Sequence, residues 1–356
     1  MRRKALMLGL LFGIFPIASV YAGPQKLALD LHGFGHVQYD VEQVNLDGPG
    51  GKDTSNNFAN GGVDLFITSQ LSDRFSFLNE TVFEFTDEGE STLDVERLLL
   101  KFSQSEQFNL AAGRGHTALG YWNQRFHHGT WLQTTTDRPI IYLFEDDGGI
   151  LPVHFVGLEA SGALADGQLA YTANVANGRG KITDEVQLTT DANNSKMVSL
   201  MLTYQPEAVE DFGVGANIVW DRIPSDPATP GRASQIDELI YGFHIYYTGY
   251  PWELIGEIQF VNHDDDAAGT FDHYGAYAQI AYSIDSWKPY YRYDRLSIES
   301  GDPFFTGLPG VEDSDQHTVG IRWDLEAYVA LKFEYRFLDT DSEESHAGTV
   351  QASFAF

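Results

Sequence analysis

Residues 27–41 read LALDLHGFGHVQYDV, and this stretch decides the fold class. Its odd positions carry Leu, Gly, Val or Tyr, whereas its even positions are mostly polar. Side chains alternate between the two faces of a β-strand, so a period of two indicates a strand with one apolar and one polar face. The same alternation returns at residues 61–71, 167–177 and 328–338, and no helical stripe of useful length competes with it. The sequence therefore predicts an all-β protein.

Sixteen segments of this kind follow one another, each near the roughly ten residues that a tilted strand needs to cross a bilayer. Short turns and long polar connections alternate between them, as they do in outer-membrane barrels. A sheet in lipid must close on itself, because every backbone N–H and C=O group there needs an internal partner. We therefore predict a transmembrane antiparallel β-barrel of about sixteen strands. The predicted strands are 27–41, 61–71, 75–86, 92–103, 107–114, 152–162, 167–177, 196–205, 212–222, 237–248, 252–262, 272–283, 287–297, 316–325, 328–338 and 347–356, and the long connections include 42–60, 178–195, 223–236 and 298–315.

The competing class is a periplasmic or secreted β-solenoid or sandwich, which would need a polar outer face. One face of residues 212–220 and one face of residues 239–247 carry no charge. Trp and Tyr residues gather near predicted strand ends, where barrels have their aromatic girdles. The barrel is therefore the better interpretation, with Leu331 and Phe333 facing lipid and Ala330 facing the lumen.

The N-terminus has the pattern of an export signal. Arg2, Arg3 and Lys4 precede an apolar run, residues 5–20, that is too short for a membrane-spanning helix. Small residues at Val20 and Ala22 suit a signal peptidase. We predict a signal peptide over 1–22 and an exported barrel over 23–356, located in the bacterial outer membrane.

The composition excludes several functions. The 356 residues carry 22 Lys+Arg against 51 Asp+Glu, a formal net charge of -29. So acidic a chain is not expected to bind nucleic acid, where phosphate neutralisation dominates affinity. The sequence has no cysteine, which excludes disulfides, zinc–thiolate sites, haem attachment and Cys nucleophiles. Nothing resembles a nucleophile elbow, so no enzymatic activity is predicted.

One predicted connection, residues 115–151, is by far the longest. It contains Tyr121, Trp122, Trp131 and many other apolar residues, which would be awkward in water unless they are packed. A barrel of sixteen strands has a lumen wide enough for an aqueous channel. We therefore expect this loop to fold into the lumen and narrow it.

The whole exported chain resembles a sixteen-stranded bacterial porin, in which the third extracellular loop bends inward as the constriction. Ala112-Gly113-Arg114 and residues 117–120 are similar to the run that opens this loop in phosphate-selective-type porins, and Arg138-Pro139 and residues 148–154 are also similar. The resemblance implies the barrel fold, the role of the third loop and a homotrimer.

The resemblance does not extend to phosphate as the substrate. Gly115 and Ala118 stand where the pattern has Phe and Pro. The eyelets of those porins are lined with Lys and Arg, whereas this loop ends with the acids Glu145, Asp146 and Asp147.

The chain ends VQASFAF, residues 350–356. This segment resembles the C-terminal strand of bacterial outer-membrane proteins, whose final aromatic residue is read by the barrel assembly machinery. The resemblance implies that Phe356 is the assembly signal and that the assembly machinery is a partner.

Inward parity places charges of both signs in the lumen, and opposed charges across a narrow aperture select ions in water-filled pores. Because the lumen acids outnumber the bases, we predict a modest preference for cations. The predicted constriction residues are Glu145, Asp146 and Asp147 of the loop, facing Arg97, Lys101, Arg292, Arg322, Lys332 and Arg336; the inward acids of the wall are Asp30, Asp40, Asp64, Glu80, Glu84, Glu253 and Glu257.

Two groups of residues are candidate metal ligands, His127-His128 and His263 with residues 264–266. Adjacent residues on a strand point to opposite faces and chelate poorly, so no resident metal or cofactor is predicted. Acids in the extracellular loops are expected to face lipopolysaccharide phosphates, with Ca²⁺ or Mg²⁺ bound loosely between them. These acids are Asp87, Glu88, Glu90, Asp184, Glu185, Asp226, Asp339, Asp341, Glu343 and Glu344.

Together these features predict a passive outer-membrane diffusion channel for small hydrophilic solutes or ions. Two alternatives stay open. One is a surface assembly or adhesion platform whose lumen is plugged by residues 115–151. The other is the sheath of a larger complex, such as an electron conduit around the cytochrome of a haem-bearing partner.

Overall fold

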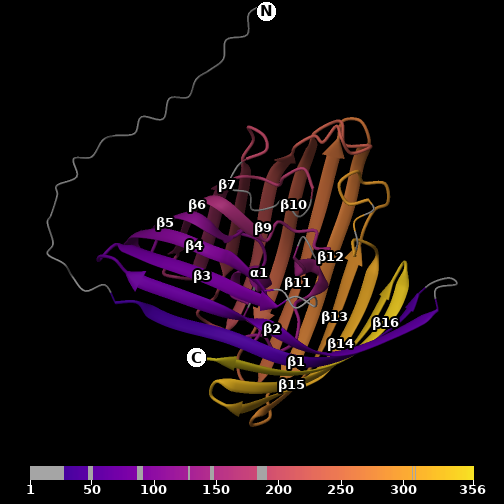
Figure 1. The fold of residues 1–356 in the computed structure, drawn as a ribbon. Helices are drawn as coiled ribbons and strands as arrows, with labels where there is room; N and C mark the ends of the chain where they lie inside the picture. The colour runs from indigo at the N-terminus through magenta and orange to yellow at the C-terminus, as the bar shows by residue number, and fades with distance from the viewer. Residues whose placement is uncertain are drawn as a thin grey trace, which may run out of the picture.

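A computed structural model describes residues 28–46, 51–85, 91–126, 129–144, 148–182, 191–306, 308 and 310–356. Within these ranges the chain forms sixteen β-strands and two short helices, α1 (Tyr121–Arg125) and η1 (Ile140–Tyr142). Neighbours in the chain pair antiparallel throughout, and β16 pairs back with β1, so the sheet is a closed barrel (Figure 1). The predicted sixteen-stranded antiparallel barrel is confirmed. The strands are β1 (Asp30–Leu46), β2 (Lys52–Gln70), β3 (Phe75–Phe85), β4 (Ser91–Ser105), β5 (Phe108–His116), β6 (His154–Leu164), β7 (Leu169–Ala176), β8 (Met197–Tyr204), β9 (Phe212–Ile223), β10 (Ile236–Tyr247), β11 (Trp252–Asp265), β12 (Gly269–Tyr282), β13 (Trp287–Ser297), β14 (Ser314–Glu326), β15 (Val329–Thr340) and β16 (Glu343–Ala355).

The outer face of the barrel is apolar. On β10 the side chains of Tyr241, Phe243 and Ile245 are exposed, whereas Glu238 and His244 of the opposite parity are buried inside. Closed barrels with such a band span the bacterial outer membrane, and this is where the chain belongs. Among the described residues, none of the helices has the length and apolar character needed to cross a membrane.

Several strands extend beyond their predicted limits. The loop predicted over 42–60 is mostly strand, because β1 and β2 stay paired from Asn45↔Lys52 downward. In the same way β16 begins at Glu343 rather than at 347. The alternation of apolar and polar residues ends where a strand leaves the bilayer, but the hydrogen bonding between neighbouring strands continues beyond that point. Hydropathy therefore does not reveal these polar extensions of the strands. The predicted signal peptide, 1–22, lies outside the described residues.

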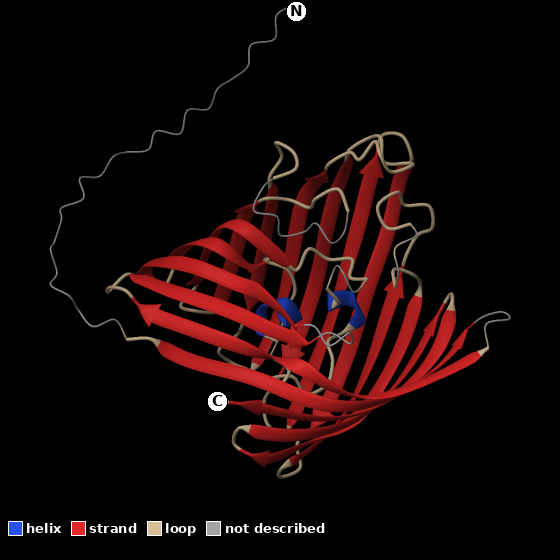
Figure 2. Ribbon diagram, in the orientation of Figure 1, coloured by secondary structure: helices blue, strands red, loops and turns tan. Residues whose placement is uncertain are grey.

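A core of buried apolar residues, within the part of the chain that the structure describes, lies inside the barrel. It joins Leu119, Trp122, Tyr142 and Leu151 to wall residues such as Ile255. The first four of these residues belong to the connection between β5 and β6, residues 117–153, which we call the inner segment. Figure 2 shows its two short helices within the ring of strands. Burying such side chains stabilises by about 1.5–3 kcal/mol each, which explains how an aromatic connection is accommodated in a lumen.

Candidate functional site

The described parts of the inner segment hydrogen-bond to inward-facing side chains of the barrel wall. The Ala118 N–H donates to Asn174 Oδ1 of β7 at 2.6 Å, and the Gly120 N–H donates to Asn217 Oδ1 of β9 at 3.1 Å. Asn123 Nδ2 donates to the Val153 carbonyl at 2.9 Å and ties the start of the segment to its end. The segment therefore enters the lumen directly from β5.

Glu257 of β11 is the main acceptor for this entry. Its carboxylate accepts the Tyr121 N–H at 2.7 Å and the Trp122 N–H at 2.8 Å. The hydroxyl groups of Tyr142 and Tyr277 donate to the same carboxylate at 2.8 and 2.6 Å. Four donors on one buried carboxylate fix the first turn of α1 against the wall.

Gly120 is required by this geometry. Its φ of +63° lies in the left-handed region, and a Cβ there would lie 1.8 Å from the Tyr142 hydroxyl and 2.7 Å from Glu257 Oε2. A larger residue would be strained and would also displace the two groups that hold the segment.

Two further wall carboxylates hold the middle of the inner segment. Asp294 of β13 accepts the Ile140 N–H at 3.2 Å. Glu334 of β15 accepts the Thr136 N–H at 2.9 Å and the Tyr290 hydroxyl at 2.8 Å. The segment is thus anchored by carboxylates on β11, β13 and β15.

Three of the predicted constriction bases bind backbone carbonyl groups of the inner segment. Lys332 Nζ donates to the Thr135 carbonyl at 2.7 Å. Arg322 donates to the carbonyls of Trp131 and Gln133 at 2.6 and 2.8 Å. Arg292 donates to the carbonyls at positions 137 and 138, both at 2.9 Å.

Arg292 and Lys332 have no exposed surface, and Arg322 has 8%. The prediction that Arg292 and Lys332 face the aperture therefore needs correction: they point inward but lie beneath the segment that narrows the lumen. Parity identified the face of each side chain, but it contains no information about what covers that face.

Arg336 is placed differently, because it borders open space. Arg336 Nη1 pairs with Asp137 Oδ2 at 2.8 Å. Although burial alone would raise the pKa of Asp137, the guanidinium groups of Arg336 and Arg138 hold this pKa below its usual value. Both residues line a space of about 410 Å³ between the inner segment and β1–β3, which we call the upper space; His36, Gln38 and Asp64 form its wall side.

The last two predicted bases, Arg97 and Lys101, lie on β4, nearer the short-turn end of the barrel. Arg97 forms an ion pair with Glu80. Lys101 lines a space of about 340 Å³ together with Asp30 and Glu159. Arg97 itself lines a space of about 330 Å³. Of the six predicted bases, Arg97, Lys101 and Arg336 therefore border spaces in the lumen that are wide enough to hold water.

These spaces follow the β1–β5 side, because the inner segment is bound to the opposite wall. Along β1 they run from Asp30 at the short-turn end to Gln38 above. The segment touches β1 between them, where Thr130 Oγ1 lies 3.2 Å from His36 Nδ1. A further space of about 620 Å³ lies below α1, beside the turn 205–211.

The fold has known counterparts. No protein-family model matches the chain, and no curated protein matches its sequence. An anion-selective porin from Comamonas acidovorans matches with a TM-score of 0.67 and 14% identity, over 93% of this chain and 100% of that chain. OmpT of Vibrio cholerae in its trimer form matches with a TM-score of 0.60 and 13% identity, over 93% of this chain and 99% of that chain. The outer-membrane channel DcaP of Acinetobacter baumannii matches with a TM-score of 0.63 and 10% identity, over 93% of this chain and 97% of that chain.

The chain has the sixteen-stranded porin fold. Identities this low show the fold alone. The resemblance to sixteen-stranded porins predicted from the sequence is confirmed at that level.

The acids Glu145, Asp146 and Asp147 lie outside the described residues of this porin fold, as do His127 and His128. Their predicted places at the constriction and in a metal site stay predictions.

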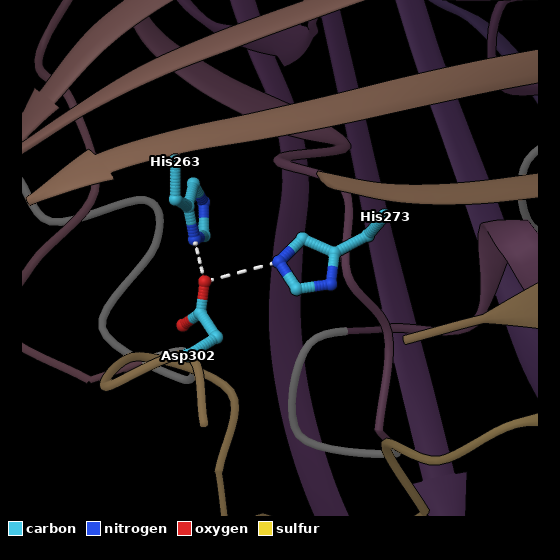
Figure 3. A group of neighbouring side chains, drawn as sticks. All are labelled: His263, His273 and Asp302. Atoms are coloured by element: carbon cyan, nitrogen blue, oxygen red, sulfur yellow. Dashed lines mark hydrogen bonds and ion pairs between the residues drawn. The ribbon is translucent and has the colours of Figure 1, made fainter. Parts of the chain in front are cut away.

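A buried cluster of charges lies at the long-loop end of the porin fold. His263 of β11 and His273 of β12 both point at Asp302 in the connection 298–313 (Figure 3). His263 Nδ1 and His273 Nε2 lie 2.7 and 3.0 Å from the same oxygen, Asp302 Oδ2. The second nitrogen of His263 lies 3.0 Å from Glu238, which pairs in turn with Arg179 at 3.1 Å. The structure thus groups His263 with these residues rather than with its sequence neighbours 264–266.

The hydrogen bonds of this cluster assign it to ion pairing rather than to metal binding. The Glu299 N–H donates to His273 Nδ1 at 3.1 Å, so a neutral His273 carries its proton on Nε2, the atom that faces Asp302. Burial opposes ionisation of Asp302, but hydrogen bonds from His263 and His273 hold its pKa well below the usual range. Arg179 also donates to the Ile150 carbonyl at 2.5 Å, which links the cluster to the inner segment.

Sequence reasoning assigned Glu257 to the field of the pore and missed its role as an anchor; Asp294 was not singled out at all. The sequence feature that could have indicated these anchors is the presence of two inward-facing acids, Glu257 and Asp294, in a barrel that also has a long aromatic connection. That signal identifies acceptors but not the N–H groups that reach them.

Proposed function

We propose that this porin-fold chain is a passive diffusion channel for small hydrophilic solutes and ions, without catalytic activity. The observation that supports it best is the one-sided attachment of the inner segment. Anchors on β7, β9, β11, β13, β14 and β15 hold the segment against one wall. Spaces lined by polar and charged groups follow the other wall.

The alternatives differ where the inner segment touches β1, through the contact of Thr130 with His36 and the stacking of Trp131 on Phe34. If this contact opens or leaves a passage beside it, the barrel conducts. If it closes the lumen, the chain is a platform or a sheath with a plugged interior. Single-channel recording in planar bilayers distinguishes these functions, and an absence of ohmic current from refolded barrels would reject the channel.

We also propose a modest preference for cations. Arg292, Arg322 and Lys332 are occupied by carbonyl groups of the inner segment, so fewer bases border water than the sequence alone suggests. Acids of the opposite wall, such as Asp30 and Asp64, border the spaces. Water-filled pores use such charges for selectivity.

The partners are part of the same proposal. One matching structure is a trimer form, which supports a homotrimer here. Lipopolysaccharide at the extracellular acids, with loosely bound Ca²⁺ or Mg²⁺, and the barrel assembly machinery at Phe356 are further proposed partners. Cross-linking in native membranes tests the trimer.

A further inference from the structure

A third space on the β1–β4 side is lined in part by the rings of Phe34, Phe66 and Phe126. It has a volume of about 330 Å³ and lies between the barrel wall and the inner segment; we call it the ring-lined chamber. Its wall side consists of His32, Phe34, Phe66, Thr68, Glu80, Arg97 and His116, and its inner-segment side consists of Gln124, Arg125, Phe126, Gly129 and Leu132.

Apolar groups in this position are unusual, because the interior of a water-filled barrel is normally polar. Phe34 and Phe66 meet edge to face at 5.3 Å, and Phe126 packs on Trp122 at 4.7 Å. Leu132 is 42% exposed although it lies within the lumen. Leaving this surface in water has a cost that an apolar occupant would remove.

The chamber also holds two guanidinium groups, those of Arg97 and Arg125. Arg97 is neutralised by Glu80 and lies over the Phe66 ring at 5.4 Å. Arg125 is exposed at the end of α1, and within the part of the chain that the structure describes it makes no hydrogen bond or ion pair. A guanidinium group presents several donors in a plane that suits a carboxylate.

The size of the chamber limits the occupant. A cavity of about 150 Å³ holds one benzene ring, so about 330 Å³ accommodates a ring with a short charged substituent. Arg125, Phe126 and Leu132 also border the larger space beside the turn 205–211, so the two spaces adjoin at these side chains. Glu207, Glu210 and Asp211 line that space, so their negative charge opposes the passage of an anion through it and favours its retention beside Arg125.

We propose that the ring-lined chamber is a binding site for small carboxylates that carry an aromatic ring, with Arg125 holding the carboxylate and Phe34, Phe66 and Phe126 surrounding the ring. The proposal rests on the proposed channel function and adds a solute class to it. A carboxylate site in the chamber is compatible with a weak preference for small cations. The site binds one class of solute at one place, whereas the ion preference depends on the charges along the whole lumen.

The test uses the full barrel in planar bilayers with KCl and adds benzoate. Benzoate should interrupt the potassium chloride current at lower concentration than acetate, which lacks the ring, or benzylammonium, which carries the opposite charge. Arg125→Gln should weaken the benzoate effect about tenfold or more, the loss expected for one charge-assisted contact. Phe66→Leu should weaken it less, and Lys196→Gln, which removes an exposed base from the connection 177–196, should leave it unchanged.

Equal effects of benzoate and benzylammonium, or an Arg125→Gln barrel as sensitive as the original, would overturn the proposal. If the barrel passes no current, the channel function fails, and calorimetric titration of the detergent-solubilised barrel with benzoate still tests the site. Unchanged benzoate binding by Arg125→Gln, or none by either barrel, would then refute it.

Discussion

Phe356 and Gly33 form the seam of the barrel. Each donates its backbone N–H to the carbonyl of the other at 2.9 Å. The Phe356 ring lies over the glycine, so that a Cβ at position 33 would be 2.4 Å from the ring and 2.9 Å from the Asp64 carbonyl oxygen. Phe354 covers Gly35 in the same way. The final aromatic residue thus has a structural place in the closed barrel, besides its predicted part as an assembly signal.

Replacing Gly33 by Val should therefore displace the Phe356 ring and open the seam. Overpacking of this kind costs about 1–3 kcal/mol, and we expect that loss in the free energy of unfolding of the refolded barrel. Urea titration in lipid vesicles measures it. Gly256→Val is the control, because the nearest atoms to a Cβ at that position on β11 are 3.7 Å away. Equal losses in the two variants would show that the ring does not seal the seam.

The lipid-facing surface gives a second prediction. Phe333→Arg should destabilise the barrel by about 2–4 kcal/mol, the cost of an Arg near the bilayer midplane on the lipid face. The sequence suggested Ala330 as a mild lumen-facing control, but Ala330 is fully buried, so an Arg there would also be disruptive. Gln38, which borders the upper space, replaces it as the control. Gln38→Arg should cost little in the same urea titration; a cost similar to that of Phe333→Arg would contradict the assignment of the two faces.

The difference between Ala330 and Gln38 shows where sequence reasoning stops. The facing of strand residues is predictable, because lipid imposes one period on every strand that crosses it. The path of the inner segment has no period, and its partners are far away in the chain: 136 positions separate Tyr121 from Glu257. Which wall the segment binds depends on hydrogen bonds and packing inside the lumen. This explains why the fold and the inward charges were predictable, and why the roles of Arg292, Lys332 and Glu257 were not.

Removing the acceptor at Glu257 should release the inner segment. Glu257→Leu leaves the N–H groups of Tyr121 and Trp122 and two hydroxyl groups without an acceptor, at about 1–3 kcal/mol for each buried group. We expect single-channel currents with greater open-channel noise and larger conductance levels. Glu257→Gln keeps one acceptor oxygen and should be intermediate, whereas Glu326→Gln, at an exposed strand end, should resemble the original. Currents from Glu257→Leu as quiet as those of the original would mean that this carboxylate is not an anchor.

The ion-paired cluster at Asp302 predicts a defined dependence on pH. Asp302 Oδ1 accepts the N–H groups of Phe304 and Phe305 at 2.6 and 2.9 Å. The pKa of Asp302 is lower in the folded barrel than in the unfolded chain, where it is about 4. The ionised carboxylate therefore stabilises the fold fully above a pH of about 4, and this stabilisation is lost as the pH falls through the pKa of the folded state. Hydrogen-exchange protection of these two amides should therefore hold from pH 7 to about 4.5. Asp302→Ala should abolish it, and Asp341→Ala, in an exposed turn, should not. Protection that falls already between pH 7 and 5 would contradict this assignment, because protonation of His263 in that range should strengthen its pair with Asp302.

Charge selectivity tests the predicted acids and a base of the upper space separately. Neutralising Glu145, Asp146 and Asp147 together should reduce the preference for cations, because three carboxylates leave the inner segment. Arg322 and Lys332 are poor choices for the opposite change, since each holds carbonyl groups of that segment. Arg336 is the suitable base, because it borders the space.

Arg336→Gln should increase the cation preference for two reasons. It removes a positive charge from the space, and it leaves the Asp137 carboxylate without its ion pair at 2.8 Å. Without Arg336 the pKa of Asp137 should rise, because the guanidinium group that favours its ionised form is gone, so the added preference should decline on acidification earlier than in the unmodified barrel. Reversal potentials in a KCl gradient measure the preference, and raising the salt should weaken it, because the Debye length is only about 8 Å at physiological ionic strength. A strong anion preference in the unmodified barrel would reject the cation assignment. If Arg336→Gln then reduced that anion preference, Arg336 would be identified as a selectivity residue for anions instead.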